Sequence, residues 1–528
     1  MSETIKLFGI DLGTTKSCIA YVDETGRPVI VNNSEGTPIT PSVVYFESAD
    51  NIVVGQVAKD TAVLEPHKTV QFVKRAIGKK KEIYNHEGRM ISPEEISSYI
   101  LKKVAHDAEA ELSCEVKDVV ITCPAYFGDA ERNSTKQAGI IAGFNVLAII
   151  NEPTAAALSY GATLGGAEKV LLVLDLGGGT FDVTLLKVGK SLETICTGGD
   201  YNLGGKDWDD SIIGYLKEEF SNQNPGCTDD ITENLETLQS LRGAAEKAKI
   251  QLSARDTTTV SVQHGVMRAR VELTREKFNA LTVNLLNQTI ILTDEVIKAA
   301  KEKGIRKFDE IILVGGSCRM PQVAEAVKNK YGTDPKLQDP DAAVAKGAAI
   351  YAVMKKKGEI DLAPPVSGTD PTQNLPPLRF PGGIPKITDV TSKSFGVGAI
   401  NKDKKDVISN LIMRNSPLPT EFSQTFGTLE ANQPSASIKI YENSSYDKEI
   451  DVSEDFLIGE TELSLPSGLP EGAPIKITCK LNENGILEIF ALDLTGNRSV
   501  SVTIERKSSI SKEELDKIVE RNKGIKIT

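Results

Sequence analysis

The stretch Gly9-Ile-Asp-Leu-Gly-Thr-Thr15 returns later in the chain as Leu174-Asp-Leu-Gly-Gly-Gly-Thr180. Each copy is an apolar strand that ends in an aspartate and continues into a tight glycine turn and a threonine. Glycine lets the backbone curl until successive N–H groups converge on an anion, and it permits close approach of phosphate oxygens. One such turn is a common strand end, but two copies predict a pair of hairpins that clamp a triphosphate and its Mg²⁺ from both sides.

The other polar features near these hairpins suit the same ligand. Asp11 and Asp175, at the two strand ends, can hold a metal ion or a metal-bound water. The chain lacks the pattern G-x-x-x-x-G-K followed by Ser or Thr, which excludes a P-loop enzyme. A third glycine turn, Leu313-Val-Gly-Gly-Ser-Cys-Arg-Met-Pro321, follows a strand and opens a helix, a natural pocket for a sugar or phosphate. By itself, however, Gly-Gly-Ser is usually a simple turn.

A predicted helix over 235–253 carries a fourth element. Glu246, Lys249, Ile250 and Ser253 follow the spacing i, i+3, i+4 and i+7, which puts all four on one face. Glu–Lys pairs on helices are most often solvated surface. The functional interpretation is an adenosine shelf, in which Glu246 and Lys249 meet the ribose, Ser253 meets the base edge and Ile250 meets the base face.

Changes in composition and hydrophobic pattern divide the chain into four segments. Residues 1–357 alternate strand-like and helix-like stretches and predict an α/β domain. Residues 358–388 are rich in proline and glycine and predict an extended linker, whereas 389–505 carry the short alternating runs of an antiparallel β-sandwich. The last segment, 506–528, predicts one short helix at about 512–523. In the first segment, the clearest strands are 5–11, 119–123, 170–175 and 310–314, and the clearest helices are 93–110, 129–142, 207–222, 235–253, 275–303 and 320–330.

Composition narrows the class of protein. At 528 residues, two to four domains are expected, and a net charge of −12 disfavours nucleic acid and anionic membrane as partners. There is no apolar run of the ~18 residues that a membrane span needs, and no secretory signal pattern. The seven cysteines are dispersed without a C-x-x-C pair, which favours reduced thiols over a disulfide framework or a zinc site. These features predict a cytoplasmic protein.

In their order along the chain, the motifs resemble those of the heat-shock protein 70 chaperones of the DnaK type, and the resemblance covers nearly the whole sequence. It implies an actin-like ATPase domain built from duplicated ribonuclease-H-like halves, followed by a peptide-binding β-sandwich. Sugar kinases and actins share the hairpin pair but lack Asn-Glu-Pro-Thr-Ala-Ala-Ala. The matching motifs are Ile10-Asp-Leu-Gly-Thr-Thr-Lys-Ser-Cys18, Val120-Ile-Thr-Cys-Pro-Ala-Tyr-Phe127, Ile150-Asn-Glu-Pro-Thr-Ala-Ala-Ala157, Asp175-Leu-Gly-Gly-Gly-Thr-Phe-Asp-Val183 and Ile312-Leu-Val-Gly-Gly-Ser317.

The resemblance implies a slow, regulated ATPase and gives roles to individual residues. Asp11 and Asp175 would orient Mg²⁺ through water, with K⁺ as a second candidate ion. Lys74 matches the family's catalytic lysine, whose ammonium would offset charge on the γ-phosphoryl group. Glu152 and Asp182 would complete the polar shell. The further residues implied to contact ATP or ADP are Gly13, Thr14, Thr15, Lys16, Gly177, Gly178, Gly179 and Thr180 (the last also catalytic) at the phosphates, Gly204 and Gly205 at phosphate or ribose, and Gly315, Gly316, Ser317, Arg319 and Asp341 at the adenosine.

The resemblance also implies that the sandwich holds extended apolar segments of unfolded proteins by main-chain hydrogen bonds and one apolar pocket. A J-domain co-chaperone and a nucleotide-exchange factor are the implied further partners. Pro124 and Arg132 match residues that report nucleotide state to the second domain, although a rigid strand-end turn would equally explain Pro124. The positions that match the peptide groove, or alternatively belong to the sandwich core, are Val397, Ile400, Phe426, Leu429, Ala436 and Ile438.

Three departures from the family pattern modify these expectations. Only 23 residues follow Glu505, too few for a long helical lid, which predicts fast peptide exchange in both nucleotide states. The leucine-rich segment that normally precedes the sandwich is absent, and this puts interdomain coupling in doubt. Ala148 replaces an arginine that helps to engage J-domain proteins, although Asn151 and Thr154 are present. The altered linker and short end therefore leave an alternative open: a nucleotide-gated adaptor or exchange-factor-like module with little coupled ATP cycling.

Overall fold

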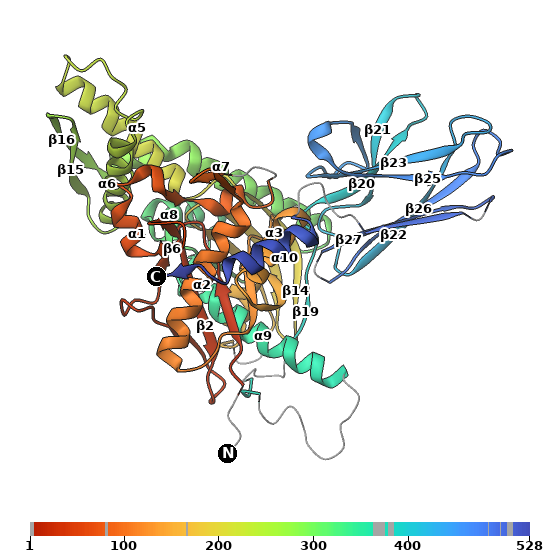
Figure 1. Ribbon diagram of the computed structural model, residues 1–528, viewed down its shortest axis with the longest axis horizontal. Helices are drawn as coiled ribbons and strands as arrows, with labels where there is room; N and C mark the ends of the chain where they lie inside the picture. The colour runs from red at the N-terminus through yellow and green to blue at the C-terminus, as the bar shows by residue number, and fades with distance from the viewer. Residues whose placement is uncertain are drawn as a thin grey trace.

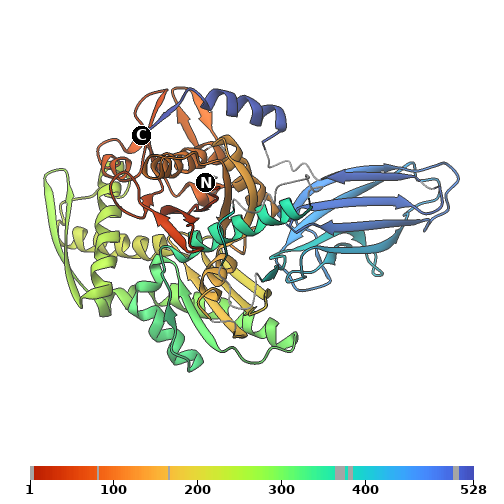
Figure 2. The ribbon, with the colours of Figure 1, turned by 90° about the horizontal axis from the view of Figure 1, so that it is seen from below.

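The computed structural model describes residues 5–79, 83–164, 167–362, 375–378, 385–483, 485–496, 498–503 and 510–528. A large α/β body carries an elongated all-β body at one end, and the last helix returns from the all-β body to the α/β body (Figures 1 and 2). The predicted order, an α/β segment followed by antiparallel strands, is therefore observed. Within these ranges, no helix has both the length and the apolar content needed to cross a bilayer.

The α/β body contains two large sheets with matching connectivity. The first has the strand order β11-β10-β1-β2-β3 and the second β18-β17-β12-β13-β14-β19. In each, three antiparallel strands are extended by parallel strands next to the first of the three. Asp11 and Asp175 therefore occupy equivalent places, at the ends of β1 and β12. The bounds are β1 Phe8–Asp11, β2 Lys16–Val22, β3 Pro28–Val31, β10 Asp118–Cys123, β11 Asn145–Asn151, β12 Lys169–Leu176, β13 Phe181–Val188, β14 Ser191–Asp200, β17 Glu310–Val314, β18 Lys336–Leu337 and β19 Lys386–Thr388.

Two helices, α4 (Glu152–Gly161) and α9 (Ala343–Leu362), pack between the two sheets. Their packing is close: a Cβ on Gly347 of α9 would lie 1.7 Å from the carbonyl oxygen of Ala155 of α4. A Cβ on Gly9 of β1 would likewise lie 2.1 Å from the Ala349 nitrogen of α9. Small residues at these points let the backbones touch, so the two sheets form one continuous body.

The outer faces of the two sheets are covered by the remaining helices, in two further apolar cores. Six of them match the predicted helices to within a few residues. We term the first sheet with its covering helices the first lobe, and the second sheet with its covering helices the second lobe. The first lobe also contains a small sheet with the order β29-β6-β5-β7, and the second lobe contains the hairpin β15–β16. The bounds are α1 Gln56–Thr61, α2 Pro93–Leu112, α3 Asp129–Ile141, α5 Gly205–Gln223, α6 Leu235–Ala254, α7 Arg275–Glu302, α8 Pro321–Tyr331, β4 Thr40–Pro41, β5 Val43–Phe46, β6 Asn51–Val54, β7 Thr69–Gln71, β8 Tyr84–His86, β9 Arg89–Ile91, β15 Thr257–His264 and β16 Met267–Thr274.

The all-β body consists of two antiparallel sheets, ordered β24-β21-β20-β23-β25 and β22-β26-β27-β28, which share one apolar core. Alternation along the strands explains the core. In β26, for example, Ile475, Ile477 and Cys479 point inward, and Lys476 and Lys480 point outward. The bounds are β20 Ser394–Ile400, β21 Asp406–Ile412, β22 Thr420–Gly427, β23 Ser435–Asn443, β24 Glu449–Asp451, β25 Leu457–Ser464, β26 Pro474–Leu481, β27 Leu487–Asp493 and β28 Ser499–Thr503.

The structure differs from the predicted linker at both ends. Helix α9 runs past the predicted boundary at 357, and β19 pairs in parallel with β14 as the edge strand of the second sheet. Pro385 directly precedes β19, a place where the missing N–H of proline costs no ladder hydrogen bond. The remaining proline-rich residues, apart from 375–378, lie outside the described residues. A segment that reads as a spacer therefore ends in a strand of the α/β body.

Residues 510–528, which we term the C-terminal clasp, lie on the first lobe of the α/β body. They contain α10 (Lys512–Asn522), which matches the predicted last helix, and β29 (Lys526–Ile527). Strand β29 pairs in parallel with β6: the Lys526 amide donates to the Asp50 carbonyl (2.9 Å) and the Thr528 amide to the Ile52 carbonyl (3.0 Å). The Ile527 side chain is only 8% exposed and joins the first-lobe core.

Polar contacts hold the helix of the clasp. Arg521 pairs with the buried carboxylate of Glu95 (2.8 Å), and Lys102 donates to the Asn522 carbonyl (2.9 Å). At the start of the clasp, the Gln137 side chain donates to the Ile510 carbonyl (2.9 Å). Contacts along its whole length thus place this segment on the α/β body and not over the sandwich.

Replacing Ile527 with aspartate is expected to detach the clasp. Burial of an isoleucine contributes about 1.5–3 kcal/mol, and a carboxylate at this position would add a desolvation cost. Trypsin cleavage after Arg521 and Lys523 should become faster, as should hydrogen exchange of the Lys526 and Thr528 amides. Lys526→Asp introduces the same group at an exposed neighbouring position and is the matched control. Equal cleavage rates for the two variants would contradict the burial of Ile527.

Candidate functional site

The two glycine turns predicted from the sequence face each other across the α/β body. A Cβ on Gly178 would lie 2.1 Å from the Thr15 hydroxyl, and a Cβ on Gly179 would lie 2.4 Å from the Thr14 methyl carbon. No side chain other than hydrogen fits at either glycine. In the second turn, the Gly177 amide donates to the Thr180 carbonyl (3.0 Å). Of the remaining residues assigned to the first turn, Gly13 abuts the Lys16 backbone and the Lys16 side chain is exposed.

The ends of β1, β12 and β13 bring a cluster of buried charges together beside these turns. Lys74 donates to the Glu152 carboxylate at 2.5 Å, and both side chains are nearly inaccessible to solvent. Asp11 accepts from the Thr122 hydroxyl (3.0 Å), and Asp182 accepts from the Tyr126 amide (2.9 Å). Lys74 lies on a short 3₁₀ turn, Val73–Ala76, which follows Phe72 in the left-handed region (φ 60°). This uncommon backbone conformation turns the chain just before the inward-facing lysine.

The electrostatics of the cluster show an excess of negative charge. Burial, followed by the charge of Glu152, raises the pKa of Asp11 to about 7 and that of Asp182 to about 7. The same two causes raise the pKa of Asp175 well above its ordinary value. Although burial opposes it, the charges of Glu152 and Asp11 raise the pKa of Lys74, so the lysine stays protonated. Four carboxylates thus share one buried ammonium.

This residue set fits a hard divalent cation. Magnesium prefers oxygen ligands and commonly keeps several waters, so carboxylates that hold it through water suit its chemistry. One buried oxygen, Oδ2 of Asp182, has no hydrogen-bond partner in the part of the chain that the structure describes. A cation with its waters would satisfy that oxygen and offset the excess charge of Asp11 and Asp175.

A second wall of the cleft assembles the residues predicted for adenosine and ribose. Lys249 donates to the Gly205 carbonyl (2.8 Å) and to Asp209 (2.7 Å), and Ser317 donates to the Gly177 carbonyl (2.9 Å). These contacts join the α6 face, the turn before α5 and the turn after β17. The other members lie along the same wall: Arg319 pairs with Asp341, Gly316 abuts Asp341, Gly315 (φ 82°) abuts Asp175, Gly204 abuts Gly179, Ser253 bonds its own helix, Glu246 pairs with Lys59, and Ile250 is exposed.

Two contacts across the cleft were not predicted from the sequence. Arg75 donates to the Gly179 carbonyl (2.9 and 2.7 Å) and pairs with Asp207, linking the two lobes at the second glycine turn. Lys59 of α1 pairs with Glu246 of α6 at the opposite edge. Adjacency to Lys74 was the only signal for Arg75, and none marked Lys59, because partners so distant in sequence leave no local pattern.

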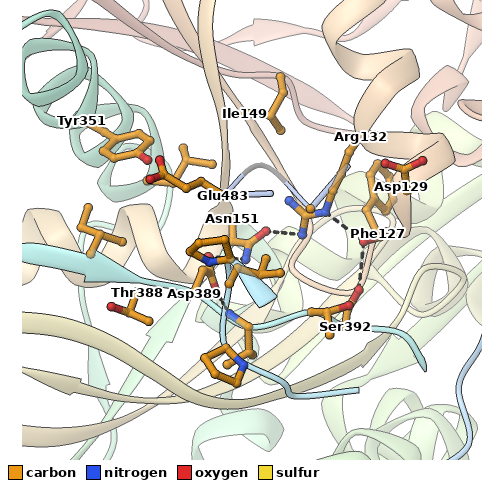
Figure 3. A pocket seen from close by; sticks show the side chains of 18 of the residues that line it. Phe127, Asp129, Arg132, Ile149, Asn151, Tyr351, Thr388, Asp389, Ser392 and Glu483 are labelled. Carbon is orange, nitrogen blue, oxygen red and sulfur yellow. Dashed lines mark hydrogen bonds between the residues drawn. The ribbon is translucent and has the colours of Figure 1, made fainter. Parts of the chain in front are cut away.

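A cavity of about 870 Å³ lies between the α/β body and the sandwich (Figure 3). On its wall, Arg132 donates to the Asn151 side chain and to the carbonyls of Phe127 (3.1 Å) and Ala125 (3.3 Å). The Asn151 side chain in turn donates to Asp389 (2.6 Å), the residue after β19. Asp389 is half-buried, and burial raises its pKa although the charge of Arg132 opposes this. The predicted switch residue Arg132 is thus linked through Asn151 to the chain that enters the sandwich.

The other predicted signalling residues lie close by. Pro124 is buried and accepts from the Phe127 amide (3.1 Å) in the turn after β10, so its position fits the rigid turn and the switch equally well. Ala148 is buried in the core between the sheets. The Thr154 hydroxyl donates to Asp389 (3.2 Å), as Asn151 does. The two residues predicted for a J-domain contact are therefore occupied by an internal partner.

The sandwich is held against both lobes. Tyr126 of the first lobe donates to Ser444 (2.8 Å), with the Lys393 ammonium 3.6 Å from its ring centre. The Asn415 side chain of the sandwich accepts from the Thr197 amide of the second lobe (2.9 Å), and the Asn415 carbonyl accepts from Lys303 of the same lobe (2.6 Å). Contact with both lobes means that any relative motion of the lobes must act on the sandwich.

The residues predicted for the peptide groove fall into two groups. Val397 and Ile438 are fully buried in the sandwich core, and Phe426 and Ala436 are partly buried against it. Ile400, the last residue of β20, is 45% exposed, and Leu429, two residues after β22, is 58% exposed. Val397 and Ile438 are therefore explained by their place in the sandwich core. The exposed apolar side chains of Ile400 and Leu429 are compatible with contact to a ligand.

Comparisons with known proteins agree with this arrangement. A family model described as Hsp70 protein matches residues 7–527. The chaperone protein DnaK of Thermosipho africanus is 38% identical over 521 residues, which cover 97% of this chain and 82% of that protein. The chaperone protein DnaK of Thermotoga maritima is 38% identical over 522 residues, with the same two coverages.

Proposed function

Because the chain belongs to the Hsp70 family of ATP-dependent molecular chaperones, we propose that it binds and hydrolyses ATP in the cleft between the two glycine turns. The family match over nearly the whole chain confirms the predicted chaperone and ATPase function and does not favour the adaptor alternative. Membership implies an actin-like ATPase domain and a β-sandwich for substrate. We assign the former, with its ribonuclease-H-like halves, to the α/β body, on the matching connectivity of its two sheets.

The observation that carries the assignment of the site is the buried cluster of Lys74 with four carboxylates beside two facing glycine turns. The backbone amides of the turns would receive the β- and γ-phosphates. Lys74 would place its ammonium against the γ-phosphoryl oxygens, and Glu152 would orient that ammonium. Mg²⁺, with K⁺ as a second candidate ion, would supply positive charge beside Asp11 and Asp175. Since phosphoryl transfer depends mainly on positioning and electrostatics, no covalent nucleophile is needed.

The proposed substrate is an extended apolar segment of an unfolded polypeptide, held near Ile400 and Leu429 of the sandwich. Their exposure supports this placement, because neither side chain is taken up by the sandwich core. A J-domain co-chaperone and a nucleotide-exchange factor are proposed as further partners, and the cytoplasm as the location. For a J-domain protein to use Asn151 and Thr154, Asp389 would first have to leave them.

Single-turnover hydrolysis of ATP, with and without an extended apolar peptide, tests this proposal. We expect hydrolysis in the absence of peptide and faster hydrolysis in its presence. No hydrolysis would contradict the assigned ATPase site. A hydrolysis rate that peptide does not change would instead contradict the coupled cycle and favour the adaptor alternative.

Replacing Asp389 with alanine is expected to abolish the peptide stimulation while ATP binding is retained. The substitution leaves the buried Asn151 and Thr154 groups without their acceptor, at a cost of about 1–3 kcal/mol each for the docked arrangement. Stimulation is measured as the ratio of single-turnover rates with and without peptide. Asp451→Ala, at an exposed position of β24, is the matched control. A stimulation ratio equal to that of the control would show that Asp389 carries no signal.

A further inference from the structure

The second lobe brings together three metal-ligating side chains that are not among the residues assigned to the nucleotide site. Cys227 and Asp229 lie in the loop between α5 and α6, and His264 is the last residue of β15. One potential ligand atom from each lies within 4.8 Å of the others. The three contribute a thiol, a carboxylate and an imidazole, a donor set that matches the ligands of zinc in proteins. We propose that Cys227, Asp229 and His264 bind a zinc ion.

The loop and the hairpin are fixed against each other before any ion arrives. Gln223 and Arg270 exchange two hydrogen bonds, from the Gln223 side chain to the Arg270 carbonyl and from the Arg270 amide back to it (both 3.1 Å). The Asn224 side chain donates to the Phe220 and Arg268 carbonyls at 3.0 and 3.2 Å. Cys227 is three residues from Asn224 and His264 is four residues from Arg268, so the site is preorganised by its two supporting segments.

The imidazole is held in place by a hydrogen bond and by an aromatic contact. Its Nδ1 lies 2.9 Å from the hydroxyl of Thr237, and Thr237 is itself buried and fixed at the start of α6, where its amide donates to Asn234 (2.8 Å). The ring of the buried Phe220 meets His264 edge to face. A histidine that donates through Nδ1 keeps Nε2 as a lone-pair ligand, and such outer-shell hydrogen bonds accompany nearly all metal-bound histidines.

The other two ligands are available. In the described residues, the Asp229 carboxylate makes no hydrogen bond or ion pair, and the Cys227 thiol has only a weak contact, 4.0 Å from the Asp229 carbonyl. Ligands about 2.0–2.3 Å from a tetrahedral zinc lie about 3.3–3.8 Å apart, so closure requires a shift of about 1 Å. Asp229 is exposed and can supply that shift by rotating its side chain. Three protein ligands leave the fourth position open to water.

Cobalt(II) is the spectroscopic probe for this site. The untagged full-length chain is saturated with Mg²⁺ and ADP, so that the nucleotide cleft is occupied, and is then titrated with Co²⁺. We expect one equivalent to bind with a thiolate-to-cobalt charge-transfer band that Zn²⁺ displaces. Cys227→Ser should abolish the band, whereas Cys114→Ser, at the other cysteine that is not buried, should leave it unchanged. A wild-type chain without the band, or a band that survives Cys227→Ser, would overturn the proposal.

Two further variants test the remaining residues. His264→Gln should lower Co²⁺ affinity at least about 10-fold, and Thr237→Val should lower it about 10–100-fold through loss of the outer-shell hydrogen bond. Zn²⁺ should raise the melting temperature of the wild type and of Cys114→Ser but not of Cys227→Ser, since only a folded site gains from binding. Affinity unchanged in His264→Gln would exclude the histidine as a ligand and with it the proposed site.

Discussion

Single-turnover ATP hydrolysis by Lys74→Ala is expected to be at least about 100-fold slower than by the wild type, because removal of one preorganised electrostatic group costs about 10²–10³ in rate. Lys74 is the only cation in the described cluster, which contains three buried carboxylates and the half-buried carboxylate of Asp11. Its ammonium is paired with Glu152 at 2.5 Å, so it enters the reaction already oriented. Water that fills the space left by the side chain would not supply its positive charge.

The comparison needs two controls. Lys68→Ala removes a lysine about half exposed on the same lobe and should change the rate little. Because breaking a buried ion pair is strongly destabilising, by about 3–5 kcal/mol, the melting temperature with ATP and Mg²⁺ must show that Lys74→Ala is folded and binds nucleotide. A folded, ATP-bound variant that hydrolyses within a few-fold of the wild type would remove Lys74 from the catalytic assignment.

Replacing Gly347 with alanine is expected to destabilise the ATPase domain by about 3 kcal/mol or more, as overpacking against backbone leaves no rotamer to relax. The added carbon would lie 1.7 Å from the Ala155 carbonyl, where α9 crosses α4 between the two sheets. Both helices would have to separate, and α4 carries Glu152 at its first position. The loss of stability is measured by calorimetry as the fall in the midpoint temperature of the first unfolding transition.

Gly243→Ala provides a control of identical chemistry. Gly243 lies within α6, and a Cβ there would meet nothing within 4 Å. Alanine gains helix propensity over glycine, so this variant should be stabilised by about 0.5–1 kcal/mol. Opposite signs for the two substitutions would confirm the tight helix crossing. Similar effects at Gly347 and Gly243 would contradict it.

Features encoded by short stretches of sequence could be predicted. The paired glycine turns, the six long helices and the antiparallel texture after residue 389 each depend on local spacing. Helix α9 was missed for a physical reason: its alanine-rich first part is packed between two sheets, so the helix shows no clear amphipathic period. Strand β19 was missed because three residues after a proline-rich stretch acquire strand structure only from β14.

Within the site, the same division between local and long-range information holds. Asp11, Asp175 and their turns were found from a repeated motif, and Lys74 from a family resemblance. Arg75 to Gly179 and Asn151 to Asp389 join residues more than a hundred positions apart, which no spacing rule connects. The cysteine spacing argued against a zinc site. It could not reveal the proposed site, because Cys227 and His264 come from different elements and lie together only in the folded second lobe.

The C-terminal clasp changes how the substrate domain is joined to the rest of the molecule. The sandwich is preceded by β19 of the second lobe and followed by β29 of the first, so the strands that flank it on both sides belong to sheets of the α/β body. Topologically it is an insertion within that body and not a module appended to it. Because an insertion is attached at both ends, release of one end leaves the other to hold the sandwich close to the α/β body at high effective concentration. Complete escape of the sandwich therefore requires the loss of edge strands from two sheets on opposite lobes.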